Sequence, residues 1–167
     1  DLDANSVTGI GEAYLHYRFD NGSVMIGRMK LETPFINPQD GRMIPTFEQG
    51  VWAKSTVGSL WLVQGGYING FWNRNTPRWK SAEDSIGYGY ELGNSSLEDT
   101  VRSDYYGHTS SKGVFAGNLR YQLSANWRLD VWDYYVENIF NLGYAEMLIA
   151  HPVGAARLLA GAQIIHQ

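Results

Sequence analysis

The sequence predicts an all-β protein built from long antiparallel strands. Aromatic residues make up 14% of the chain, with 6 Trp and 11 Tyr, and there are 19 Gly, whereas charged residues reach only 18%. Aromatic residues favour strands, and charged residues make up about a quarter of an average chain. Several stretches alternate apolar and polar residues, which is the period of a strand with one apolar face. At 167 residues the chain is long enough for one domain.

The first hairpin is predicted over residues 12–31. Apolar and polar residues alternate on both sides of Asn21-Gly22, which is the strongest short signal for a hairpin turn. The predicted polar faces carry His16 and Arg18 before the turn and Arg28 and Lys30 after it, whereas Met25, Gly27, Met29 and Leu31 share the other face of the return strand. His16 has no partner at metal-ligand spacing, so we expect no metal site here.

Residues 33–50 predict a loop that carries a motif. Three of the five prolines fall in it, and proline removes a backbone donor, so the loop cannot be the middle of a strand. Apolar residues are interleaved with the turn formers, which indicates that the loop packs back onto the fold. At its centre, Asp40-Gly41-Arg42 places a cation beside a flexible glycine. Arg42 could equally lie in water or pair with Asp40 or Glu48.

Further strands follow on either side of one very long connection. They are predicted over 51–56, 60–72, 114–123, 127–131, 141–150 and 157–167, with tight turns at 57–59, 124–126 and 151–156 and a bulge or strand end near Asp133. Residues 73–113 are far longer than a usual loop, so they are functional or separately folded. We predict a pore constriction there, with Arg74, Tyr105, Tyr106 and His108 as candidates, although the tyrosines and His108 could simply anchor the loop.

Strand length and connection length together predict a transmembrane β-barrel. The strands run to about ten residues, which is the length that crosses an outer membrane. Tight turns alternate with long loops, as in such barrels, and aromatic residues near the strand ends fit their interfacial girdles. No apolar run is long enough for a transmembrane helix.

Several classes of function are excluded or disfavoured. The net charge of −4 argues against a nucleic-acid partner. There is no cysteine, which excludes disulfides and thiolate metal sites. No phosphate-binding glycine loop, zinc motif or Gly-x-Ser-x-Gly elbow is present. We therefore expect neither enzymatic activity nor a cofactor.

The chain resembles the OprD-type outer-membrane porins. The resemblance is carried by three groups of residues: Gly27-Arg28 with Thr33-Pro34, Asn37, Asp40-Gly41-Arg42-Met43, Pro45, Thr46-Phe47 and Gly50; Gly65-Gly66-Tyr67 with Arg74-Asn75; and Val131-Trp132-Asp133-Tyr134-Tyr135 with Glu137-Asn138-Ile139-Phe140. It covers most of the chain and is weakest in 73–113.

The resemblance implies an 18-stranded barrel in a Gram-negative outer membrane. It also implies a monomer or weak trimer and a narrow, loop-constricted pore. The family passes small solutes, often carboxylate-bearing ones, along lumen arginines and lysines. This chain has room for only about seven or eight strands and ends in mid-strand, so we expect it to be an internal piece of a longer protein.

The expected solute path is a set of cations on the predicted polar faces. They are Arg18, Arg28, Lys30, Arg120, Arg128 and Arg157, and Arg42 joins them because it resembles the loop arginine of the family motif. Several cations along one wall lower the barrier for an anion and bind it briefly. The alternative is a solvated strand face whose cations are balanced by Asp130, Glu146 and Glu12.

Two other functions remain open at this point. A soluble β-sandwich could bind carbohydrate on exposed Trp and Tyr, and it would purify without detergent. A barrel could also serve mainly as a surface adhesin with 73–113 as its binding part. Trimming that loop would then abolish partner binding rather than change conductance.

Overall fold

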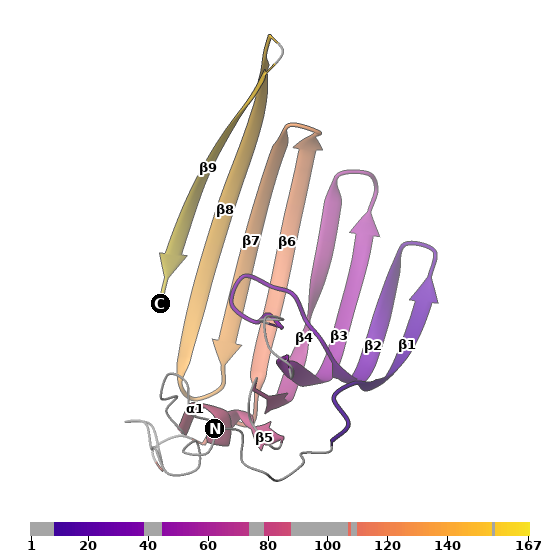
Figure 1. Ribbon diagram of the computed structural model, residues 1–167, viewed down its shortest axis with the longest axis vertical. Coiled ribbons are helices and arrows are strands. Elements are labelled where there is room, and N and C mark those ends of the chain that lie inside the picture. Colours follow the sequence, from indigo (N-terminus) through magenta and orange to yellow (C-terminus); the bar gives the residue numbers. More distant parts are fainter. Residues whose placement is uncertain (1–8, 39–44, 74–78, 88–106, 108–109, 155) are drawn as a thin grey trace, which may run out of the picture.

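The protein is one antiparallel sheet in which each long strand lies beside the next in the sequence (Figure 1). The computed structural model describes residues 9–38, 45–73, 79–87, 107, 110–154 and 156–167. The elements are β1 (Ala13–Phe19), β2 (Gly22–Met29), β3 (Phe47–Val57), β4 (Trp61–Trp72), β5 (Lys80–Ser81), α1 (Ala82–Gly87), β6 (Val114–Ser124), β7 (Trp127–Val136), β8 (Phe140–Val153) and β9 (Ala156–His166). The sheet order is β1-β2-β3-β4-β6-β7-β8-β9, with β5 paired to β4. The predicted all-β antiparallel fold is confirmed.

Tight turns and long connections lie at opposite ends of the sheet (Figure 1). At the turn end, residues 20–21, 58–60 and 125–126 join neighbouring strands. At the loop end, 30–46 and 73–113 are the long connections, and 137–139 is a short one. No helix in the described part of the chain is long and apolar enough to cross a membrane.

The structure corrects three predicted boundaries. β3 begins at Phe47, so the end of the predicted 33–50 loop is strand. β7 runs unbroken past Asp133, which pairs with Gly117 and Gly143 while the Asn141 side-chain amide donates to its carboxylate at 3.1 Å. Register shifts lie instead at Gln49/Gly50 and Gln122/Ser124.

The third correction concerns β8, which continues to Val153, into the predicted turn at 151–156. Pro152 is tolerated there because it lies beyond the end of β7 and pairs only with Arg157 of β9.

Register divides the side chains into two faces. Directly opposed residues of antiparallel strands point to the same side of the sheet. One face, which we call the outer face, is apolar and exposed: Leu15 is 78% exposed and Ile164 is 72% exposed. Its other large members include Tyr17, Ile26, Val63, Phe115, Leu119, Val131 and Met147. A soluble protein would cover so continuous an apolar surface, so this face needs an apolar environment.

Aromatic rings on the outer face gather toward the two ends of the strands. Toward the turn end, Trp61 and Tyr121 lie with ring centroids 4.4 Å apart. Toward the loop end, Tyr67 and Phe115 lie 4.6 Å apart. Two such bands are what the interfacial regions of a membrane favour, because the rings have an apolar body and, in Tyr and Trp, a polar group.

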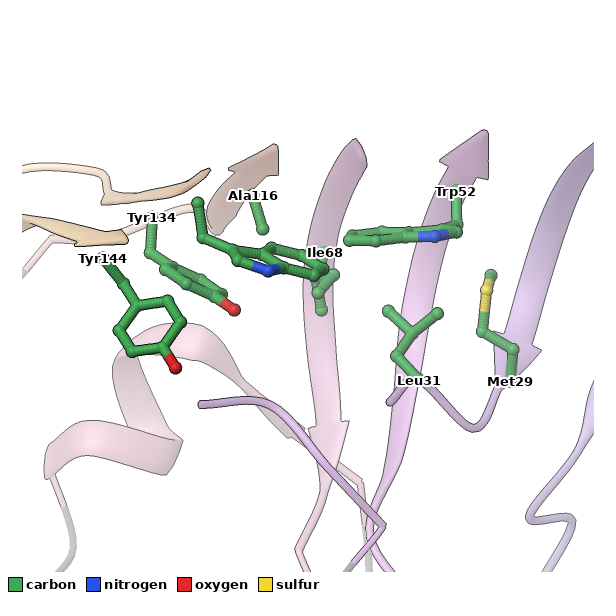
Figure 2. Close-up of a cluster of buried hydrophobic side chains, with 8 residues drawn as sticks. Met29, Leu31, Trp52, Ile68, Ala116, Tyr134 and Tyr144 are labelled. Carbon is green, nitrogen blue, oxygen red and sulfur yellow. The ribbon is translucent and has the colours of Figure 1, made fainter. Parts of the chain in front are cut away.

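The opposite face, which we call the inner face, is covered near the loop end by the segment 31–38. Leu31 packs into a buried cluster that also contains Met29, Trp52, Ile68, Ala116, Trp132, Tyr134 and Tyr144, and Ile36 packs against it. Figure 2 shows this cluster spread along the sheet, with Tyr144 at one end and Met29 at the other. Phe35 reaches β7 and β8, where its ring lies edge-on to Tyr134 and Tyr144 at 5.5 Å from each.

We expect Gly66→Ala to abolish folding of the barrel. Gly66 pairs with Trp52 and Ala116, and a Cβ at this position would overlap the carbonyl oxygen of Val51. Backbone on a neighbouring strand cannot move aside without breaking the ladder. Gly117→Ala is the matched control, because a Cβ there has nothing within 4 Å. The measurement is the yield of the heat-modifiable folded band in gel electrophoresis, and equal yields for both variants would contradict the expectation.

Candidate functional site

The inner face carries a ladder of charged side chains between the apolar cluster and the turn end of the sheet. Arg120 of β6 and Arg128 of β7 meet at Asp130. Nε of Arg120 donates to Oδ1 of Asp130 at 2.6 Å, and Nε of Arg128 lies 2.7 Å from Oδ2. The Asp130 side chain is only 3% exposed, whereas those of Arg120 and Arg128 are 34% and 33% exposed. The carboxylate is therefore buried beneath two guanidinium groups that remain open to solvent.

The ladder continues across β8 to β9. Nη2 of Arg128 donates to Oε2 of Glu146 at 3.0 Å, and Nε2 of Gln163 donates to Oε1 of the same carboxylate at 2.7 Å. Side chains from four consecutive strands are thus connected. Arg120 and Arg128 therefore pair with Asp130 and Glu146, two of the acids that the alternative interpretation of the sequence named as balancing the cations.

A groove of about 370 Å³ lies at the turn end of the ladder. Its lining includes Gln122, Arg128 and Arg157, and Gly161 has no side chain to fill it. Nη2 of Arg157 donates to Oδ1 of Asn126 at 3.3 Å, which ties Arg157 to the turn between β6 and β7. Two guanidinium groups therefore border one groove on the inner face.

Arg18 also lies on the inner face, in β1, where it is exposed and opposite Ser23. Ser23 in turn lies opposite Lys54 of β3, which is exposed on the same face. Sequence reasoning missed Lys54. It lies two residues after the buried Trp52, and this period-two spacing could have placed both on one face.

The prediction that Arg28 lines the inner wall is wrong, whereas the predicted place of Lys30, which lies beyond the end of β2, stays a prediction. Arg28 lies opposite Ala13 and Gln49, on the outer face. Its Nε donates to Oε1 of Gln49 at 3.1 Å, and its guanidinium lies 4.6 Å from the centroid of the Trp79 ring. Lys30 follows β2 and is exposed, between two residues of the buried inner cluster.

The physical reason is that apolar residues do not always face outward in this sheet. The alternation of residues 23–31 predicts Met29 and Leu31 on the face opposite the lumen cations, but segment 31–38 covers the inner face near the loop end, and both residues are buried there. Five of the predicted site residues cannot be placed. Arg42, Arg74, Tyr105, Tyr106 and His108 lie outside the described residues.

Comparison with known proteins decides the family. Residues 4–166 match the OprD family of outer membrane porins. The chain belongs to the OprD family. No curated protein sequence matches this porin chain. The resemblance to this family and the localisation in the Gram-negative outer membrane that it implied are confirmed.

Solved OprD-type structures share the fold of this porin segment. OpdK of Pseudomonas aeruginosa, solved with vanillate, has a TM-score of 0.70 at 18% identity, over 91% of this chain and 36% of that one. OccAB4 of Acinetobacter baumannii has a TM-score of 0.72 at 16% identity, over 91% and 34%. OccK8 of Pseudomonas aeruginosa has a TM-score of 0.71 at 14% identity, over 91% and 35%. The porin chain thus spans about a third of the length of these structures, and its apolar outer face is the lipid-facing one.

Proposed function

We propose that this chain forms part of the wall of an outer-membrane channel for passive uptake of small solutes that carry a carboxylate, such as small organic acids or amino acids. The observation that supports it best is the ladder of Arg120 and Arg128, because both arginine side chains stay about one-third exposed while Asp130 is buried. A solute passing the inner face would meet the N–H donors of Arg120 and Arg128 more than the carboxylate of Glu146, whose side chain is 19% exposed.

Further cations on the inner face extend this path. Arg18 and Lys54 lie on β1 and β3, and Arg157 lies on β9 beside the groove. Spaced cations bind a carboxylate weakly and repeatedly, which permits entry without trapping the solute. Among the similar structures, OpdK was solved with vanillate, a small carboxylate. That ligand agrees with the proposed class of solute.

The segment 31–38 would narrow the pore from the inside. It crosses the inner face from β2 toward β8, where Phe35 contacts Tyr144 (Figure 1). The constriction predicted for residues 73–113 stays a prediction, as do the adhesin alternative and the weakly trimeric or monomeric state. Membership of the OprD family rules out the alternative of a soluble, carbohydrate-binding β-sandwich.

We expect Arg120→Gln to weaken carboxylate binding in the complete porin. One lost charge contact in a wet pore removes about 1 kcal/mol, which corresponds to about a fivefold loss of affinity. The measurement is the block of single-channel chloride current by gluconate in a planar bilayer, together with the reversal potential in a KCl gradient. Arg28→Gln is the matched control, because it removes a cation from the outer face. Equal effects of the two variants would contradict a solute path along the ladder.

A further inference from the structure

Asp130 occupies an unusual place in the ladder. It is 2% exposed, and it lies between Arg120 on β6 and Glu146 on β8 in the strand register. Its Oδ1 accepts a hydrogen bond from Nε of Arg120, whereas its Oδ2 forms an ion pair with Nε of Arg128 at 2.7 Å without a hydrogen bond. One buried carboxylate therefore holds two guanidinium groups at once.

This geometry fixes which nitrogens remain for a solute. The Nε–H and one N–H of Nη2 lie on the same edge of a guanidinium, so an arginine held at this edge keeps the N–H donors of its other edge free, in a rigid plane. Arg128 uses Nη2 for Glu146, so it is held at two points. Because both Nε atoms lie within 2.7 Å of the same carboxylate, the two guanidinium groups are neighbours on the wall.

We propose that Asp130 is a positioning residue that joins Arg120 and Arg128 into one carboxylate-binding site. The proposal rests on the proposed function of the inner face as a path for carboxylate solutes. It differs from a path in which each arginine acts as an independent step. In a single site, both guanidinium groups contact one carboxylate, and Asp130 holds them in the receiving orientation without touching the solute.

Asp130→Asn is expected to change carboxylate binding in the direction opposite to the one that the change in net charge alone would give. Asp130→Asn removes a negative charge from the wall, so the net charge alone would strengthen binding of every anion. If Asp130 positions the arginines, the same substitution leaves both side chains free to move. The solute must then order two long, flexible side chains when it binds, and this entropy cost lowers its affinity. Carboxylate binding then weakens while the preference for small inorganic anions stays the same or rises.

The test uses the complete porin in planar bilayers. Gluconate block of the chloride current reports carboxylate binding, glucose is the neutral solute of similar size, and the reversal potential in a KCl gradient reports net charge. We expect Asp130→Asn to weaken gluconate block about fivefold or more, with an anion preference that is unchanged or higher. Gluconate block that is unchanged or stronger in this variant would overturn the proposal.

Asp133→Asn is the control, since it is the same substitution three residues along β7 but on the outer face. We expect it to change neither readout. Asp130→Glu keeps the charge and moves the carboxylate, so we expect it to recover part of the gluconate block. If Asp130 served only to keep the barrel folded, Asp130→Asn would change the gluconate block and the reversal potential together. That result would also reject the proposal.

A second measurement does not depend on how well Asp130→Asn folds. We expect Arg120→Gln, Arg128→Gln and the double variant to lose gluconate block non-additively, because the two arginines form one site. Losses that simply multiply would show independent steps and would reject the single site. If neither single variant changes gluconate block, the proposed function itself fails, which distinguishes that failure from failure of the positioning role.

Discussion

Replacing Glu48 with alanine will widen the pore. Glu48 lies at the start of β3 with none of its surface exposed, and its Oε2 accepts the backbone N–H of Leu31 at 2.9 Å. This bond fixes the point where segment 31–38 turns onto the inner face. Without the carboxylate the N–H has lost its acceptor, which costs about 1–3 kcal/mol for a buried donor. We expect a larger single-channel conductance and weaker anion preference in the complete porin.

Glu32→Ala is the control for this experiment. It removes the same charge one residue after Leu31, but its side chain is exposed. We expect its conductance to match that of the unaltered protein.

Phe35→Ala tests the other end of the same segment. It removes the two edge-on ring contacts with Tyr134 and Tyr144, and each such contact contributes about 0.5–1.5 kcal/mol. A rise in conductance smaller than that of Glu48→Ala is expected. If conductance stays unchanged in both variants, segment 31–38 does not narrow the pore.

The strands could be predicted from the sequence because a half-buried strand has a local signature. Residues 114–123 alternate along their whole length, and Asn21-Gly22 marks a hairpin without reference to any distant residue. The loop at 33–50 could be recognised from its prolines. Its packing onto the inner face was predicted only in general terms, because Phe35 meets its partners Tyr134 and Tyr144 a hundred residues later.

The faces were harder to predict than the strands. Apolar alternation identifies two sides of a strand but does not say which side meets lipid. For β1 the apolar side is the outer one, whereas for the end of β2 the apolar Met29 lies inside beneath the loop. Arg28 was misplaced for this reason. The outward position of an arginine is tolerated because Gln49 and the Trp79 ring both contact it.

The pairing of charges was not predictable from one sequence. Asp130 could be counted as a balancing acid, but its position between two arginines depends on the register of β6 against β7. A shift of that register by one residue would send Asp130 and Arg128 of β7 to the face opposite Arg120 of β6. The burial of the Asp130 carboxylate between two arginines is therefore set by the pairing of strands and not by the local sequence.

Placing an arginine on the lipid-facing side will destabilise the barrel far more than placing one beside it on the inner side. Leu15 and His16 are neighbours in β1, and both are exposed, but they point to opposite faces. An arginine facing lipid near the middle of a barrel strand costs about 2–4 kcal/mol, falling to about 0–1 near the interfaces. We expect Leu15→Arg to lower the free energy of unfolding by about 2–4 kcal/mol. We expect His16→Arg to change it little, because the inner face already accepts Arg18 in the same strand.

The measurement is urea unfolding of the complete porin from lipid vesicles, followed by tryptophan fluorescence and by the heat-modifiable band. The two variants carry the same added residue in adjacent positions, so strand propensity is matched and the face is the difference between them. Equal stability would mean that both sides of β1 meet water, and the assignment of inner and outer faces would have to be abandoned. Greater loss for His16→Arg would invert the faces, and Arg120, Asp130 and Arg128 would then lie toward lipid, where an exposed charged ladder could not persist.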